Sequence, residues 1–175
     1  MPSRNLEEMN PLATYKIPFR GLKAGKHDFQ LDVNQEFFTY FPESEIEDAT
    51  GVVDVVLDRS DTNMVLHLTM NLNWKVPCGR CLEELNYNLH REDRIAIQYG
   101  EETVITEDLW TLGKNEIELD LAQIILEMSH LARPTHQVHE NESDCDQSML
   151  GFINNESEEE SKKTTDPRWD ALKNL

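Results

Sequence analysis

The sequence predicts an α+β fold, built mainly as an antiparallel β-sheet or an open barrel with one packed helix and an acidic, partly disordered C-terminal arm. Three observations predict it. Every even position from Met64 to Val76 is apolar and most odd positions are polar, which is the period of a long half-buried strand. A second alternating segment begins soon afterwards at Leu85. Helical spacing of apolar residues is clearest in one later segment, after Asp120.

The segments before Met64 add shorter strands. Tyr15–Phe19 predicts a short strand, and Pro18 within it favours a position at a sheet edge. Lys26–Val33 alternates, and we expect it to form a hairpin with the first strand. Asn34–Tyr40 predicts a short helix or a loop, and the β-branched run Val52–Leu57 is typical of a buried strand.

The second alternating segment resumes at Ile95 after an interruption. Arg91 and Asp93 break its apolar face, which predicts a bulge, a twist or a strand that extends past the core. Further on, Trp110 and Leu112 are expected to dock on the sheet. The two alternating segments flank a short cysteine-containing loop, which we therefore predict to be the tip of a β-hairpin.

The helical segment has recognisable ends. Asp120 is the predicted N-cap, with Gln123 as its capping-box partner, and Arg133-Pro134 ends the helix. We expect the apolar face to pack on the sheet. That face consists of Leu121, Ile124, Ile125, Met128 and Leu131.

A change of composition divides the chain into a domain, residues 1–137, and an acidic flexible tail, residues 138–175. The tail ends in a predicted short amphipathic helix. Asp166 suits its N-cap and Pro167 its first turn. Trp169, Leu172 and Leu175 share one face of this helix, which suits docking on a partner or on the domain.

The composition narrows the function classes. The 175 residues contain no apolar run long enough to cross a bilayer, and the N-terminus has no signal-peptide pattern. Three cysteines argue against a secreted disulfide framework, so a cytoplasmic protein with reduced thiols is expected. A net charge of −18 opposes broad nucleic-acid binding and favours a basic partner or a metal.

Two residues separate Cys78 from Cys81 on the predicted hairpin tip, so their thiols can bind one metal ion from the same side. A structural zinc site needs two more ligands. The candidates are Cys145 together with His136, or with His139 as the alternative. Such a site requires the tail to return to the hairpin tip.

The same spacing also occurs in redox pairs, which is the alternative hypothesis. The pair does not start a helix, and Glu83 and Glu84 are expected to raise the thiol pKa values, with only Arg80 acting in the opposite direction. No phosphate loop or nucleophile motif is present in the sequence. We therefore predict no enzymatic activity and no small-molecule substrate.

These motifs resemble a known family. The segment Cys78–Glu83, reading CGRCLE, is similar to the cysteine motif of the bacterial YceD family. The Asp120–Leu121 helix with Glu127 and the Pro134-Thr135-His136 stretch followed by Cys145 are also similar to that family's pattern. The terminal Asp166–Trp169 segment, reading DPRW, resembles its ending.

The resemblance implies a cytoplasmic, noncatalytic factor in large-subunit ribosome assembly or ribosomal RNA accumulation. It implies a ribosomal protein, precursor large-subunit rRNA or an assembly factor as the partner. The candidate contact residues are Arg80 and Leu82 at the hairpin tip, with Arg168, Trp169 and Leu172 in the terminal helix. A thiol-disulfide enzyme or sensor and a zinc-stabilised interaction domain are the alternatives.

Overall fold

The computed structural model describes residues 11–60, 63–106 and 109–152. The chain divides into two compact units. The first, called the sheet unit, comprises the described residues up to Lys75 together with Asn86–Thr135. The second, called the cysteine unit, comprises Val76–Leu85 and the described residues from His136 onward.

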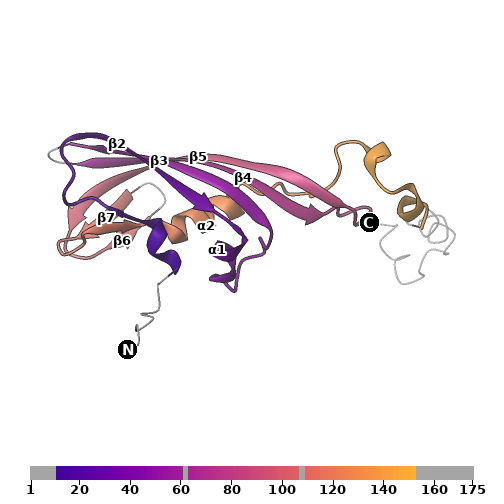
Figure 1. The fold of residues 1–175 in the computed structure, drawn as a ribbon, viewed down its shortest axis with the longest axis horizontal. Helices are drawn as coiled ribbons and strands as arrows, with labels where there is room; N and C mark the ends of the chain where they lie inside the picture. The colour runs from indigo at the N-terminus through magenta and orange to yellow at the C-terminus, as the bar shows by residue number, and fades with distance from the viewer. Residues whose placement is uncertain (1–10, 61–62, 107–108, 153–175) are drawn as a thin grey trace, which may run out of the picture. The chain divides into compact units, whose positions relative to one another are not determined.

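The sheet unit is built on a six-stranded sheet with the strand order β2-β3-β4-β5-β7-β6 (Figure 1). The strands are β2 (Gly25–Val33), β3 (Ala49–Arg59), β4 (Met64–Pro77), β5 (Glu84–Gly100), β6 (Val104–Ile105) and β7 (Leu109–Gly113). The last residues of β4 and the first of β5 belong to the cysteine unit. The pairs β2–β3, β3–β4 and β6–β7 are antiparallel and β5–β7 is parallel, so the sheet is mixed. Its end strands are β2 and β6, so it is open.

A second, two-stranded sheet pairs β1 (Lys16–Pro18) with β8 (Glu118–Asp120). The predicted hairpin of the first two strands is therefore wrong, because β2 pairs with β3 instead. Hydrogen bonds to the backbone around β1 explain the difference. The amide of Phe19 donates to the carbonyl of Ile117, which continues the β1–β8 contact, and the guanidinium of Arg59 holds the carbonyls that follow β1.

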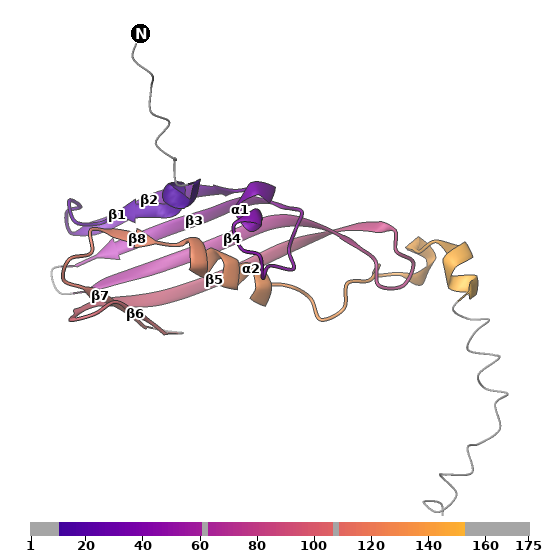
Figure 2. The same ribbon diagram turned by 90° about the horizontal axis from the view of Figure 1, so that it is seen from below.

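The core lies where β4 faces α2 (Ala122–Leu131), which crosses one face of the sheet (Figure 2). The alternation predicted for β4 is confirmed, since its even positions from Met64 to Trp74 are buried. The hydroxyl of Ser129 in the helix donates to Ile125 O at 2.7 Å and lies 3.4 Å from the sulfur of Met70 in β4. The helix therefore rests directly on the central strand.

The start and the end of α2 differ from the prediction. Its N-cap is Leu121 and not Asp120, because Asp120 is the last residue of β8 and pairs with Lys16 at 3.5 Å. The Asp120 carboxylate still accepts a hydrogen bond from the amide of Ala122 at 3.2 Å. Gln123 donates to Glu127 and forms no capping box. The predicted apolar face also loses Leu131, which ends the helix at 66% exposure.

β5 shows no interruption of its alternation at the two charged residues. Arg91 and Asp93 are half-buried at positions in phase with the buried leucines and isoleucines of the strand. The Arg91 Nε–H donates to Asp93 Oδ2 at 2.7 Å. The two charges therefore satisfy one another along one face. Of the three predicted alternatives, the bulge is not seen, because burial keeps its period of two along the continuous strand.

The remaining short elements support the core. α1 (Gln35–Thr39) is the short helix allowed by the sequence, and the side chain of Asn34 caps it by accepting from Phe37 N at 3.1 Å. Trp110 and Leu112 are buried, as expected, within strand β7 itself. Within the described residues, no helix has the length and apolarity to span a membrane.

Candidate metal centre

Residues 78–83 connect β4 to β5 in a tight loop that belongs to the cysteine unit. The amide of Cys78 donates to Glu83 O at 2.8 Å, and the amide of Leu82 donates to Cys78 O at 2.9 Å. Leu82 reverses the chain in the left-handed region, with φ 64°, a conformation that is unfavourable for a bulky residue. This turn leaves the side chains of Cys78 and Cys81 buried.

The second segment of the unit starts at His136 and includes the 3₁₀ helix η2 (Glu142–Asp144) and a helical stretch at 147–152. The amide of Gly79 donates to Gln137 O at 2.7 Å, and the guanidinium of Arg80 donates to His139 O at 3.3 Å. A Cβ atom at Gly79 would lie 3.3 Å from Gln137 O, which is a tight contact. The glycine therefore allows the two segments to approach closely.

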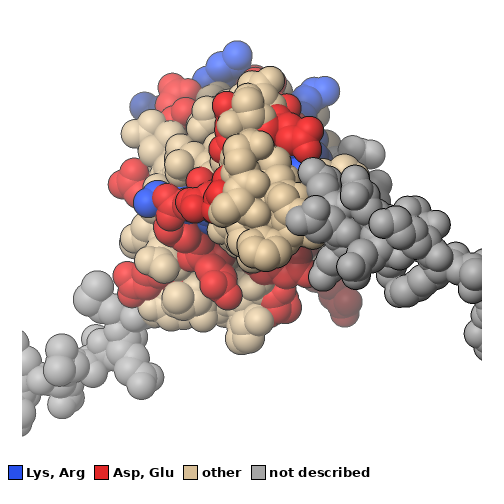
Figure 3. Space-filling model, turned by 90° about the vertical axis from the view of Figure 1, so that its right-hand side faces the viewer, with Lys and Arg blue, Asp and Glu red and all other residues tan. Residues whose placement is uncertain are grey.

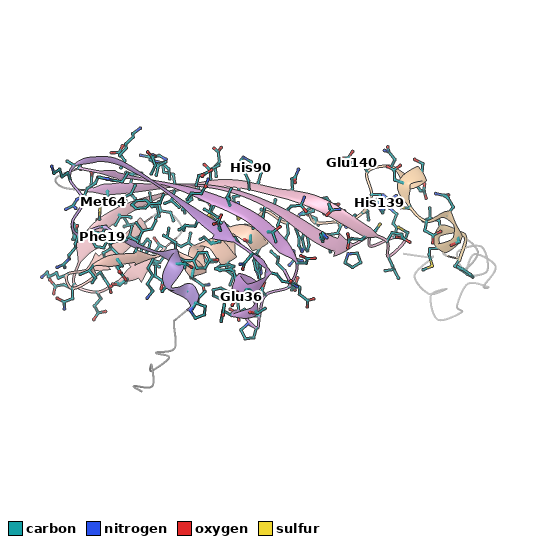
Figure 4. All side chains as sticks on the ribbon, in the orientation of Figure 1. Phe19, Glu36, Met64, His90, His139 and Glu140 are labelled. Atoms are coloured by element: carbon teal, nitrogen blue, oxygen red, sulfur yellow. The ribbon has the colours of Figure 1, made fainter. Side chains whose placement is uncertain are left out.

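Three thiols and one imidazole meet between these segments. The ligand atoms of Cys78, Cys81, His139 and Cys145 all lie within 4.8 Å of one another. Figure 4 shows His139 and Glu140 on the segment that leads to η2. The Nδ1 atom of His139 lies 3.6 Å from the sulfur of Cys81 and 3.5 Å from that of Cys145.

These two distances have a simple geometric meaning. A tetrahedral zinc ion binds sulfur at about 2.3 Å and nitrogen at about 2.0–2.1 Å, so the edge from sulfur to nitrogen is about 3.6 Å. The distances of His139 Nδ1 to Cys81 and Cys145 match this edge. The donor set, with three sulfurs and one nitrogen, is typical of a structural zinc site.

The environment shifts the pKa values of Cys78 and Cys145 in opposite directions. Burial acts to raise the pKa of Cys78, but amide hydrogen bonds from Cys81, Arg80 and His139 together lower this pKa to about 6. The expectation that neighbouring glutamates raise the thiol pKa values is therefore wrong for Cys78, because backbone amides solvate its thiolate. Burial raises the pKa of Cys145 to about 11, and the nearby thiols of Cys81 and Cys78 add to this effect.

The histidine of the cluster is His139. His136, the other candidate, is exposed and is not a member of the group. The two histidines are equivalent by spacing alone, and the carbonyl contacts of Gln137 and His139 with the loop distinguish them. The sequence did not single out Gly79 as a contact residue, although a glycine inside a CxxC turn is a signal of close backbone approach.

The candidate contact residues at the hairpin tip differ in their environment. The Arg80 side chain is half-buried and donates a hydrogen bond to His139 O, so it stabilises the site. Leu82 is 66% exposed. The other candidates, Arg168, Trp169 and Leu172, lie outside the described residues, as does the predicted terminal helix.

Comparison with known proteins identifies the family. No curated protein and no solved structure matches this chain. The family model described as "Large ribosomal RNA subunit accumulation protein YceD" matches residues 66–175, which is more than half of the chain. The matched range contains all four residues of the cluster. The chain therefore belongs to the YceD family of large ribosomal RNA subunit accumulation proteins.

Proposed function

We propose that this protein is a noncatalytic cytoplasmic factor for large-subunit ribosome assembly, and that zinc bound by Cys78, Cys81, His139 and Cys145 shapes its binding element. The observation that carries the proposal is the meeting of these four side chains in one compact unit. The family description, an accumulation protein for the large ribosomal RNA subunit, supports the cellular role.

The donor set favours a structural and not a catalytic metal. Catalytic zinc sites keep one position open for water or substrate, whereas four protein ligands close the coordination sphere. The three thiols of the cluster are buried, which further limits access of a substrate to the ion. A zinc ion held in this way stabilises the loop against the segment that follows α2, because the ligands come from both.

The surface favours a basic partner. Acidic side chains predominate over basic ones on the face of the molecule drawn in Figure 3. The whole chain carries a net charge of −18, which attracts a basic ribosomal protein and repels an RNA backbone. A basic ribosomal protein therefore suits the charge better than precursor rRNA, with an assembly factor as a further candidate. Leu82 is a candidate contact, since it is 66% exposed and its backbone is in the left-handed region, and such strained residues cluster at functional sites.

The test is complementation of cells that lack this protein. Cells are given the wild type, the Cys81→Ser variant or a Thr69→Ser control in β4, and the ratio of large- to small-subunit rRNA is measured. The wild type and the control should restore the ratio, and Cys81→Ser should not. Full restoration by Cys81→Ser, with the protein at normal abundance, would contradict a role for the metal in the function.

A redox function is the second candidate, because the thiol of Cys78 has a pKa of about 6 and lies close to Cys81. A redox enzyme must cycle a disulfide between these two thiols. Zinc-loaded protein exposed to a glutathione redox buffer should keep both thiols reduced if the site is structural. Reversible formation of a Cys78–Cys81 disulfide with retained function would favour the redox candidate.

A domain that binds zinc for stability alone is the third candidate. Chelation would then unfold the cysteine unit without weakening capture of large-subunit precursors. Under our proposal, capture from a lysate of precursor particles is lost with the metal and returns when zinc is restored.

A further inference from the structure

The sheet unit contains a cavity of about 350 Å³ that is separate from the cysteine cluster. Its walls include Phe41, Ile105, Trp110 and Leu112, and three carboxylates, those of Glu116, Glu118 and Asp120, lie among its lining residues. The cavity thus combines apolar side chains with acidic ones. This combination suits a ligand with an apolar stem and a cationic end.

Trp110 supplies the second observation. Its side chain is buried, at 2% exposure, and its indole Nε1–H has no acceptor among the described residues. The indole nitrogen is covered by neighbouring atoms, so an acceptor in the cavity does not reach it. Trp110 nevertheless lines the cavity, so its indole N–H resonance reports on a ligand bound there.

The two glutamates are available to a cation. Glu116 accepts a hydrogen bond from the Thr103 hydroxyl at 3.0 Å, and no cation pairs with Glu116 or Glu118 within the described ranges. The third carboxylate of the cavity, Asp120, differs because Lys16 lies 3.5 Å from it. Two uncompensated carboxylates at one apolar cavity favour a positively charged occupant over a phosphate group.

We propose that this cavity receives a lysine or arginine side chain from an extended segment of a basic protein partner. The aliphatic stem lies against the apolar wall, to which Trp110 belongs, and the cationic end meets Glu116 and Glu118. The proposal rests on the proposed function only in taking the partner to be a basic protein. It is independent of the metal.

The test follows the indole N–H resonance of Trp110 by ¹⁵N-edited NMR on the full chain with zinc added. The probe is the peptide acetyl-Ser-Lys-Ser-amide, and the control peptide carries norleucine in place of lysine. The lysine peptide should move the Trp110 resonance in a saturable manner. The norleucine peptide should bind about fivefold more weakly, or worse, because it lacks the charge.

Two pairs of substitutions provide the matched comparison. The Glu116→Gln/Glu118→Gln variant should weaken lysine-peptide binding about fivefold or more. The Glu43→Gln/Glu47→Gln variant makes the same charge change at exposed residues that do not line the cavity, and should alter binding by less than about twofold.

The proposal is overturned if the Trp110 resonance does not respond, if norleucine binds equally well, or if both glutamine variants lose the same affinity. It is also overturned if deletion of residues 1–10 alone moves this resonance, since the chain's own Arg4 would then be the occupant. If the peptide does not bind but the protein still restores rRNA accumulation, only the cavity proposal is refuted. If the peptide binds but the protein does not restore rRNA accumulation, the proposed function is refuted and the cavity proposal stands.

Discussion

Replacing His139 by alanine should weaken zinc binding far more than the same change at His136. The structure places His139 Nδ1 at 3.5 and 3.6 Å from two cysteine sulfurs, whereas His136 is exposed and outside the cluster. Structural zinc contributes about 10–16 kcal/mol in zinc-finger peptides, so one of four ligands accounts for roughly 2.5–4 kcal/mol. His139→Ala should therefore weaken zinc binding about a hundred- to a thousandfold.

The assay is competition against a fluorescent zinc chelator of known affinity, at fixed pH and under reducing conditions. His136→Ala is the matched control and should change the zinc affinity by less than about twofold. Circular dichroism in the presence of saturating zinc checks that both variants are folded. The reasoning is refuted if the His136 variant loses more affinity than the His139 variant, or if neither loses any.

Three further predictions concern the pH dependence of the site and the stability of the sheet unit. Cys145, with its pKa raised to about 11, must lose a proton when zinc binds, so zinc affinity should rise about tenfold per pH unit between about pH 7 and 9 from this thiol alone. Below the pKa of Cys78, about 6, release of the proton of this thiol should steepen the slope further, and a pH-independent affinity would contradict both values. Leu68→Ala, at a buried position of β4, should lower the free energy of unfolding, measured in urea, by about 2–5 kcal/mol. His67→Ala, on the exposed face of the same strand, should change it by less than about 0.5 kcal/mol. Equal effects of the two substitutions would contradict the assignment of the two faces. Gly51→Ala should lower the free energy of unfolding by about 1–3 kcal/mol, because a Cβ atom would overlap the backbone of β4, and a neutral result would show that β3 and β4 are further apart.

Features that depend on neighbours in the sequence could be predicted well. The strand from Met64 is readable because alternation has a period of two whatever the partner strand is. The pairing of β1 with β8 could not be read in this way, since it joins segments about a hundred residues apart in the chain. The same local approach treated Arg91 and Asp93 as a break, because a pattern of single residues does not show that two charges on one face can pair.

The candidate site also has features that could be predicted from neighbours in the sequence and features that could not. A CxxC pair between two alternating segments is a local signal, and it correctly directed attention to the loop. The identity of the histidine depends on how the segment after α2 lies against that loop, which the hydrogen bond from Gly79 to Gln137 fixes. The left-handed turn at Leu82 was also unreadable, because leucine carries no sequence signal for that conformation.

The most direct test of the account is X-ray absorption at the zinc edge, combined with metal quantification, on the full chain purified under reducing conditions. The account predicts about one zinc per chain, bound by three sulfurs at about 2.3 Å and one nitrogen at about 2.0–2.1 Å. Substoichiometric zinc that added metal does not restore, or coordination dominated by oxygen, would contradict the central claim that these four residues form a structural zinc site.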